Sequence, residues 1–100
     1  MVREGKCGEV LHTHRNRTKE EARAEMLIES VKGAGGCRDE VVVVIQDETG
    51  LVEAYGLDEF PAGPDLYFVP ARGRLEIKCG GIEETAHDGT CKVRWTFKWF

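Results

Sequence analysis

His12 and His14 lie two residues apart, and their type and spacing make them the first candidates for chemistry in this chain. On a strand, residues i and i+2 point to the same face, an arrangement that proteins use to bind metal ions. The next carboxylates, Glu20 and Glu21, belong to the following element, so the sequence places no third ligand beside the pair. We therefore name His12 and His14 as candidate metal ligands, with two half-exposed imidazoles on an edge strand as the alternative, and expect no cofactor.

A short basic cluster follows, formed by Arg15, Arg17 and Lys19. It stands where we expect a helix to begin, and the free amides and positive end of a helix dipole favour anions. These three residues are therefore a candidate anion-binding site for a phosphate or a carboxylate. The alternative is an intramolecular role, in which the three cations face the acidic middle of the chain.

The four cysteines of the chain, Cys7, Cys37, Cys79 and Cys91, contain no CxxC pair, which excludes zinc-ribbon and thioredoxin-like signatures. Two disulfides are arithmetically possible in three connectivities. A chain of 100 residues can bury a core without such crosslinks, so we expect four reduced, partly buried thiols. The sequence shows no convergent catalytic set, and we expect a protein that is not an enzyme.

Residues 39–71 carry eight Asp or Glu and no Lys or Arg, within a chain of net charge −4. Nucleic-acid binding requires many clustered cations, so a nucleic-acid partner is not expected. Within this acidic stretch, a loop over residues 56–64 contains two prolines and presents Asp58, Glu59 and Phe60. An acidic tip with one aromatic ring is typical of a surface that binds a basic protein, and we predict that Asp58, Glu59 and Phe60 contact such a partner.

The elements that position these residues begin with one predicted helix over residues 19–32. Thr18 and Glu21 have the spacing of a capping box, in which each side chain hydrogen-bonds the other residue's backbone amide. Apolar residues then recur with the i, i+3, i+4, i+7 period of an amphipathic helix. These are Ala24, Leu27, Ile28 and Val31. Gly33 is expected to end the helix.

The other predicted elements are strands. Residues 8–14 form a first strand, and the β-branched run over 41–45 forms a central strand that pairs with 51–55 in a hairpin. A short strand over 66–69 is closed by Pro70.

The C-terminal segment predicts a second hairpin, between residues 75–79 and 91–99, with a turn at Asp88 and Gly89. Alternation along it predicts buried Trp95 and Phe97 between exposed cations. In the expected register facing positions sum to 176, so that Cys79 faces Phe97 and a Cys79–Cys91 crosslink is not expected.

The sequence thus predicts a single α+β domain over residues 1–100, with the N-terminal helix packed on a curved, mostly antiparallel sheet of about five to six strands in the order β-α-β-β-β-β-β. No apolar run could span a membrane and no export signal is present, so a cytoplasmic location is expected.

The function we expect is a small acidic binding or regulatory module, inhibitor-like, that recognises a basic protein. The alternative is a small enzyme or ligand-binding domain with a cavity between helix and sheet and His12 and His14 at its mouth. We expect such a cavity to be lined by Tyr55, Tyr67 and Trp95. Either is compatible with a homo-oligomer formed through an edge strand.

Overall fold

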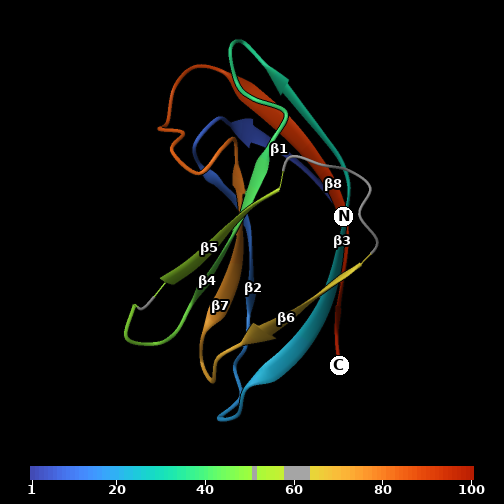
Figure 1. Ribbon diagram of the computed structural model, residues 1–100, viewed down its shortest axis with the longest axis vertical. Coiled ribbons are helices and arrows are strands. Elements are labelled where there is room, and N and C mark those ends of the chain that lie inside the picture. Colours follow the sequence, from blue (N-terminus) through green and yellow to red (C-terminus); the bar gives the residue numbers. More distant parts are fainter. Residues whose placement is uncertain (51, 58–63) are drawn as a thin grey trace.

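Eight strands make up the regular structure of the computed structural model, which describes residues 1–50, 52–57 and 64–100 (Figure 1). They are β1 (Val2–Lys6), β2 (Val10–Arg15), β3 (Ala22–Ala34), β4 (Val41–Gln46), β5 (Val52–Leu57), β6 (Asp65–Val69), β7 (Arg74–Cys79) and β8 (Thr90–Trp99). Among the residues described there is no helix, and therefore none that could cross a membrane.

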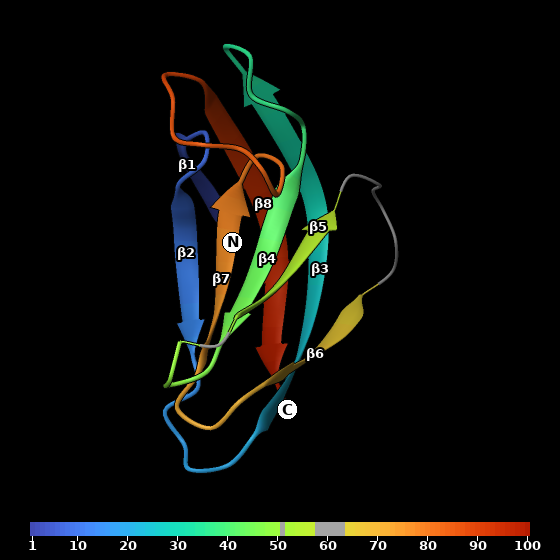
Figure 2. The same ribbon diagram turned by 60° about the vertical axis from the view of Figure 1, so that its left-hand side comes forward.

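The strands form two antiparallel four-stranded sheets that face each other as a sandwich (Figure 2). One sheet has the order β1-β8-β3-β6 and the other the order β2-β7-β4-β5. Apolar side chains from both inner faces fill the space between the sheets, as the alternation along each strand requires. The largest of the fully buried ones are Trp95, Leu75, Ile77, Val41 and Val43.

The predicted α+β fold is wrong, because the segment expected to be a helix is β3, the longest strand of the protein. The sequence of this segment fits the two-residue period of a strand as well as the helical period. Ala24, Met26 and Ile28 alternate as a strand requires, and these three side chains face the core. Extended, the segment pairs with both β8 and β6. This long-range pairing on two sides outweighs the helix propensity of the segment.

The expected capping box is instead a turn organised by Asn16. The Asn16 side-chain oxygen accepts hydrogen bonds from the backbone amide of Thr18 (3.0 Å) and from its hydroxyl (2.7 Å). The Asn16 amide group donates to the carbonyl oxygens of Glu20, Val69 and Pro70 at 2.8–3.1 Å. Asn16 is only 4% exposed, and it ties the β2–β3 turn to the end of β6.

The predicted C-terminal hairpin is also wrong. β7 pairs with β2 and β4 in one sheet, whereas β8 pairs with β1 and β3 in the other, so the chain crosses from sheet to sheet between them. The expected register, with Cys79 facing Phe97, does not exist. The alternation along β8 is nevertheless confirmed for Trp95, which is fully buried, and for Lys92, Arg94 and Lys98, which are exposed. Phe97, expected to be buried, is only partly buried against the core.

Other local predictions are confirmed. β4 is a central strand and forms the expected hairpin with β5. β6 matches the predicted short strand, and β2 matches the predicted first strand within a few residues. β1 was not predicted, and it pairs with β8 at the edge of its sheet.

Candidate functional site

A groove with acidic and aromatic walls runs between β5 and β6, the two edge strands on one side of the sandwich. It consists of two adjoining hollows of about 340 and 190 Å³ that share Ile45, Glu53 and Phe68 as walls. Its carboxylates come from four separate segments, and its remaining side chains are largely aromatic or aliphatic. The carboxylates are Glu21, Asp47, Glu53 and Asp65; Tyr55, Leu66, Tyr67 and Phe68 are also in its walls. We call these eight residues and Ile45 the acidic–aromatic groove.

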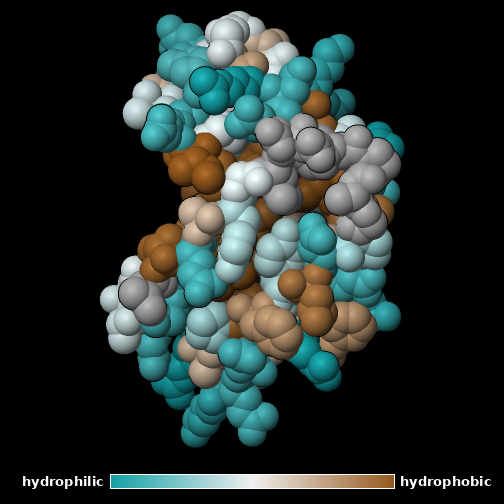
Figure 3. Space-filling view, viewed as in Figure 1, coloured by the Kyte–Doolittle hydropathy of each residue, from teal (hydrophilic) through white to brown (hydrophobic). Residues whose placement is uncertain are grey.

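Alternation along the two edge strands explains why these side chains meet. Glu53 and Tyr55 lie two residues apart on β5, and Asp65 and Tyr67 lie two residues apart on β6, so each pair shares a face of its strand. The two tyrosine rings approach edge to face with centroids 6.2 Å apart. Unlike a core cluster, this one leaves apolar surface in contact with solvent: Leu66 and Phe68 are each 50% exposed. In Figure 3, brown hydrophobic side chains lie among teal hydrophilic ones over the position of β6.

The electrostatic environment of the groove is negative. Burial raises the pKa of Tyr67 to about 12, and the neighbouring Asp65 carboxylate and Tyr55 act in the same direction. The Tyr55 hydroxyl donates to a Glu53 carboxylate oxygen at 2.7 Å, and this hydrogen bond raises the pKa of Tyr55. Both phenols therefore remain protonated near neutral pH. No lysine or arginine stands among the described residues that line either hollow.

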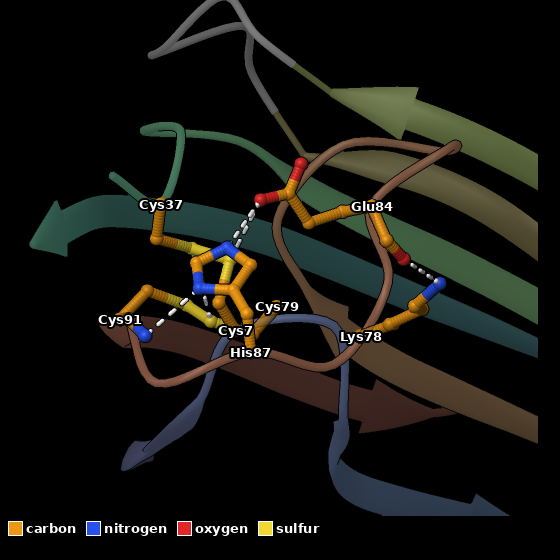
Figure 4. Close-up of polar contacts among 8 residues, drawn as sticks. Cys7, Cys37, Lys78, Cys79, Glu84, His87 and Cys91 are labelled. Carbon is orange, nitrogen blue, oxygen red and sulfur yellow. Dashed lines mark hydrogen bonds and ion pairs between the residues drawn. A yellow bond between two sulfur atoms is a disulfide. The ribbon is translucent and has the colours of Figure 1, made fainter. Parts of the chain in front are cut away.

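All four cysteines gather at one corner of the sandwich (Figure 4). Cys7 and Cys37 are paired, as are Cys79 and Cys91, with Cα atoms 5.7 and 6.1 Å apart. The expectation of four free thiols is therefore wrong for this structure, because the crossing of the chain from β7 to β8 places Cys79 opposite Cys91 in the other sheet. The two pairs touch: the sulfur atoms of Cys37 and Cys79 are 4.0 Å apart.

Glu84 and His87 stand at the same corner and were not among the predicted site residues. The Nε2 atom of His87 lies 2.7 Å from a Glu84 carboxylate oxygen, and the same oxygen lies 3.2 Å from the sulfur of Cys7. The Nδ1 atom of His87 accepts a hydrogen bond from the amide of Gly89 (2.8 Å), so Nε2 carries the proton that is donated to Glu84. The i, i+3 spacing of Glu84 and His87 was the only signal for this pair in the sequence.

His12 and His14 do share one face of β2, as predicted, with ring centroids 4.6 Å apart. That face points toward Trp95 in the opposite sheet, whose indole N–H donates to Nε2 of His14 at 3.1 Å. The His14 ring also stacks on Phe97 at 3.7 Å. Burial, followed by the charge of His12, lowers the pKa of His14 to about 4. A metal at His14 Nε2 must displace the bond to Trp95, and the metal site at His12 and His14 stays a prediction.

No helix begins beside Arg15, Arg17 and Lys19 in the structure, so the helix N-terminus expected to support their anion-binding role is absent. Arg15 ends β2, and the other two lie exposed in the turn that Asn16 organises. The three remain a basic surface cluster without the helix amides. The predicted contact residues Asp58, Glu59 and Phe60 lie outside the residues that the structure describes.

The cavity between helix and sheet that the alternative function required has lost its basis, since the helix is absent. Of the aromatic residues expected to line it, Tyr55 and Tyr67 line the acidic–aromatic groove, and Trp95 is fully buried in the core. Comparison of the chain with protein-family models, with curated proteins and with solved structures found no match.

Proposed function

We propose that the protein is a binding module whose acidic–aromatic groove receives an extended basic segment of a protein partner. The observation that carries the proposal is the composition of the groove: four carboxylates and the exposed rings of Tyr55 and Phe68, with no cation among its described walls. A segment in which lysine or arginine alternates with apolar residues complements both features. Its charges would face the carboxylates, and its apolar side chains would cover Leu66 and Phe68.

The position of the groove between two edge strands adds a second source of affinity. Each edge strand presents backbone N–H and C=O groups along its outer side, and an extended peptide can pair with such an edge as an added strand. Alternate side chains of the peptide then enter the groove, which matches the alternation of charged and apolar groups that we infer for the partner.

The two components of the groove contribute differently to binding. Carboxylates mainly accelerate encounter with a cationic partner and make association sensitive to salt, whereas desolvated rings mainly slow dissociation. Phe68 is the expected anchor because it lines both hollows and is half exposed in the free protein. Its truncation removes about 1 to 3 kcal/mol of binding free energy if it serves as a hot spot.

The test uses two synthetic peptides that alternate leucine or phenylalanine with lysine in one case and with glutamate in the other. The lysine peptide is expected to bind, and to shift the NMR amide signals of β5 and β6. Glu53→Lys combined with Asp65→Lys should slow its association and reduce the salt dependence, while Phe68→Ala should speed its dissociation.

Glu4→Lys combined with Glu9→Lys changes net charge equally and serves as the matched control, because these residues lie near β1 and β2 at the opposite edge of the sandwich. Equal binding of both peptides, or equal loss in the groove and control variants, would contradict the proposal. Self-association through β5 or β6, seen as a concentration-dependent mass in solution, would also contradict it, because the groove would then be part of a homo-oligomer interface and not a site for a basic partner.

A cytoplasmic location stays part of the proposal. It requires that the four cysteines be reduced, since disulfides seldom persist in the cytosol.

A further inference from the structure

The corner that holds the cysteines brings together four sulfur atoms from four separate segments of the chain. Cys7 follows β1, Cys37 lies in the β3–β4 connection, Cys79 ends β7 and Cys91 is the second residue of β8. All four are at most 9% exposed. The sulfur atoms of Cys7, Cys37 and Cys79 lie within 4.8 Å of one another, and Cys91 is paired with Cys79.

The sulfur–sulfur distance between the two disulfides is close to that of a tetrahedral metal site. With a Zn–S bond of about 2.3 Å, the sulfur atoms of a four-cysteine site are roughly 3.8 Å apart. The distance between Cys37 and Cys79, which belong to different disulfides, is 4.0 Å. Two independent disulfides do not require contact with each other, whereas four ligands of one ion do.

A second observation concerns the contact between Cys7 and Glu84. The Glu84 carboxylate oxygen is 3.2 Å from the Cys7 sulfur, a separation at which a thiol donates a hydrogen bond. A disulfide sulfur has no proton to donate, so this contact is favourable for the reduced residue and not for the oxidised one. The contact therefore suits the reduced, metal-free thiol. In the zinc-bound state Cys7 is a thiolate, and the Glu84 carboxylate then opposes binding by like-charge repulsion.

We propose that the reduced protein binds one Zn²⁺ ion at this corner through Cys7, Cys37, Cys79 and Cys91. Reduction of both disulfides by two equivalents of a dithiol supplies four electrons and four protons and yields four thiols. Binding of Zn²⁺ releases these four protons and leaves a tetrathiolate centre with charge −2. Disulfides and zinc are thus alternative crosslinks of the same four segments.

Backbone hydrogen bonds around the corner hold the cysteine-bearing segments together. The amide of Cys7 donates to Gly89 (2.8 Å), and the amide of Gly8 donates to Cys79 (2.9 Å). Gly80 adopts a φ of 92°, and a Cβ atom there would lie 3.1 Å from the Cys7 sulfur. The Lys78 ammonium donates a hydrogen bond to the Glu84 carbonyl oxygen (2.9 Å) and so ties β7 to the segment that carries Glu84.

The test is a Co²⁺ titration of the full chain after reduction and removal of the reductant under nitrogen. One equivalent of Co²⁺ is expected to give the intense thiolate charge-transfer band and the visible d–d bands of a tetrahedral site, and one equivalent of Zn²⁺ should abolish them. Oxidised protein, and reduced protein in urea, serve as controls and should bind at least about 100-fold more weakly.

Variants separate the four-cysteine site from the other donor sets of the chain. Cys79→Ser should weaken binding by more than about 100-fold, which exceeds the loss typical of removing an outer-shell partner. Glu84→Gln leaves the four thiolates in place and should bind as tightly as the parent chain or more tightly, and a double variant with His12→Ala and His14→Ala should also retain binding. Should Cys79→Ser fail to fold, the charge-transfer intensity per bound Co²⁺ in the parent chain still counts the thiolate ligands.

Several results would overturn the inference: a folded, reduced chain that binds no Co²⁺, an octahedral spectrum, or binding that Glu84→Gln abolishes. Alkylation of protein purified from the cytoplasm of an expression host, under denaturing conditions without reductant, gives an independent check. Four alkylated cysteines together with one zinc in the native mass spectrum support the site, while no alkylation would show that the disulfides persist even in a reducing compartment.

Discussion

Protonation of His14 is expected to destabilise the folded protein below neutral pH. His14 is 9% exposed, stacks on Phe97, and accepts a hydrogen bond from the Trp95 indole with the nitrogen that an added proton would occupy. Burial lowers its pKa from 6.5 to about 4. Above pH 6.5 both the folded and the unfolded state hold the neutral ring, so the contribution of His14 to stability is fully present.

As the pH falls below 6.5, the unfolded chain takes up the proton first and the free energy of unfolding decreases. The loss grows until the pH reaches about 4, where the folded state also becomes protonated. Linkage between these two pKa values gives a loss of about 2.5 kcal/mol at about pH 4.5 relative to pH 7.5. This is a large share of the stability of a domain of this size, which is typically about 5 to 15 kcal/mol.

The assay is urea unfolding, followed by tryptophan fluorescence, at these two pH values for the parent chain and for His14→Gln. The glutamine oxygen can accept the hydrogen bond from Trp95 but does not titrate, so carboxylates and His12 contribute similarly to both proteins. The pH-dependent loss should be smaller in His14→Gln by about 2.5 kcal/mol. Equal pH dependence of the two proteins would refute the buried, neutral His14 on which this reasoning rests.

Two further predictions concern stability at neutral pH. Trp95→Ala empties the centre of the core and should lower the free energy of unfolding by about 3 to 5 kcal/mol in urea titrations. The control Thr96→Ala, on the solvent face, should change it little. An unchanged midpoint for Trp95→Ala would contradict the core position of Trp95. Asn16→Ala removes the donor to three carbonyl oxygens and the acceptor for Thr18. Thermal unfolding should show that the free energy of unfolding falls by about 2 to 3 kcal/mol. Retention of the parent stability would mean that water replaces these hydrogen bonds without cost.

Segments with one dominant pattern were predictable from sequence. The β-branched run of β4 handicaps a helix at χ1 and suits a strand covered on both faces. The strict alternation of β8 placed Trp95 inside and Lys92, Arg94 and Lys98 outside, whichever strand it paired with. The same local reasoning put His12 and His14 on one face of β2, although it could not show that this face meets Trp95.

The sites depended on which strands became neighbours. Glu53, Tyr55, Asp65 and Tyr67 form one groove only because β5 and β6 are edges of different sheets on the same side of the sandwich. Each pair has the spacing of an ordinary half-exposed strand, so no local signal distinguished these residues from a solvated surface.

The sequence by itself determined the locations of most strands, the inward and outward faces of β8, and the concentration of negative charge in the middle of the chain. Tertiary structure decided the conformation of β3, because its residues fit both a helical and an alternating period and only pairing with β8 and β6 on both sides selects the strand. It also decided the cysteine corner: a hairpin between β7 and β8 would have separated Cys79 from Cys91. Crossing between sheets brings them together, since local preferences act over a few residues whereas strand pairing depends on the whole chain.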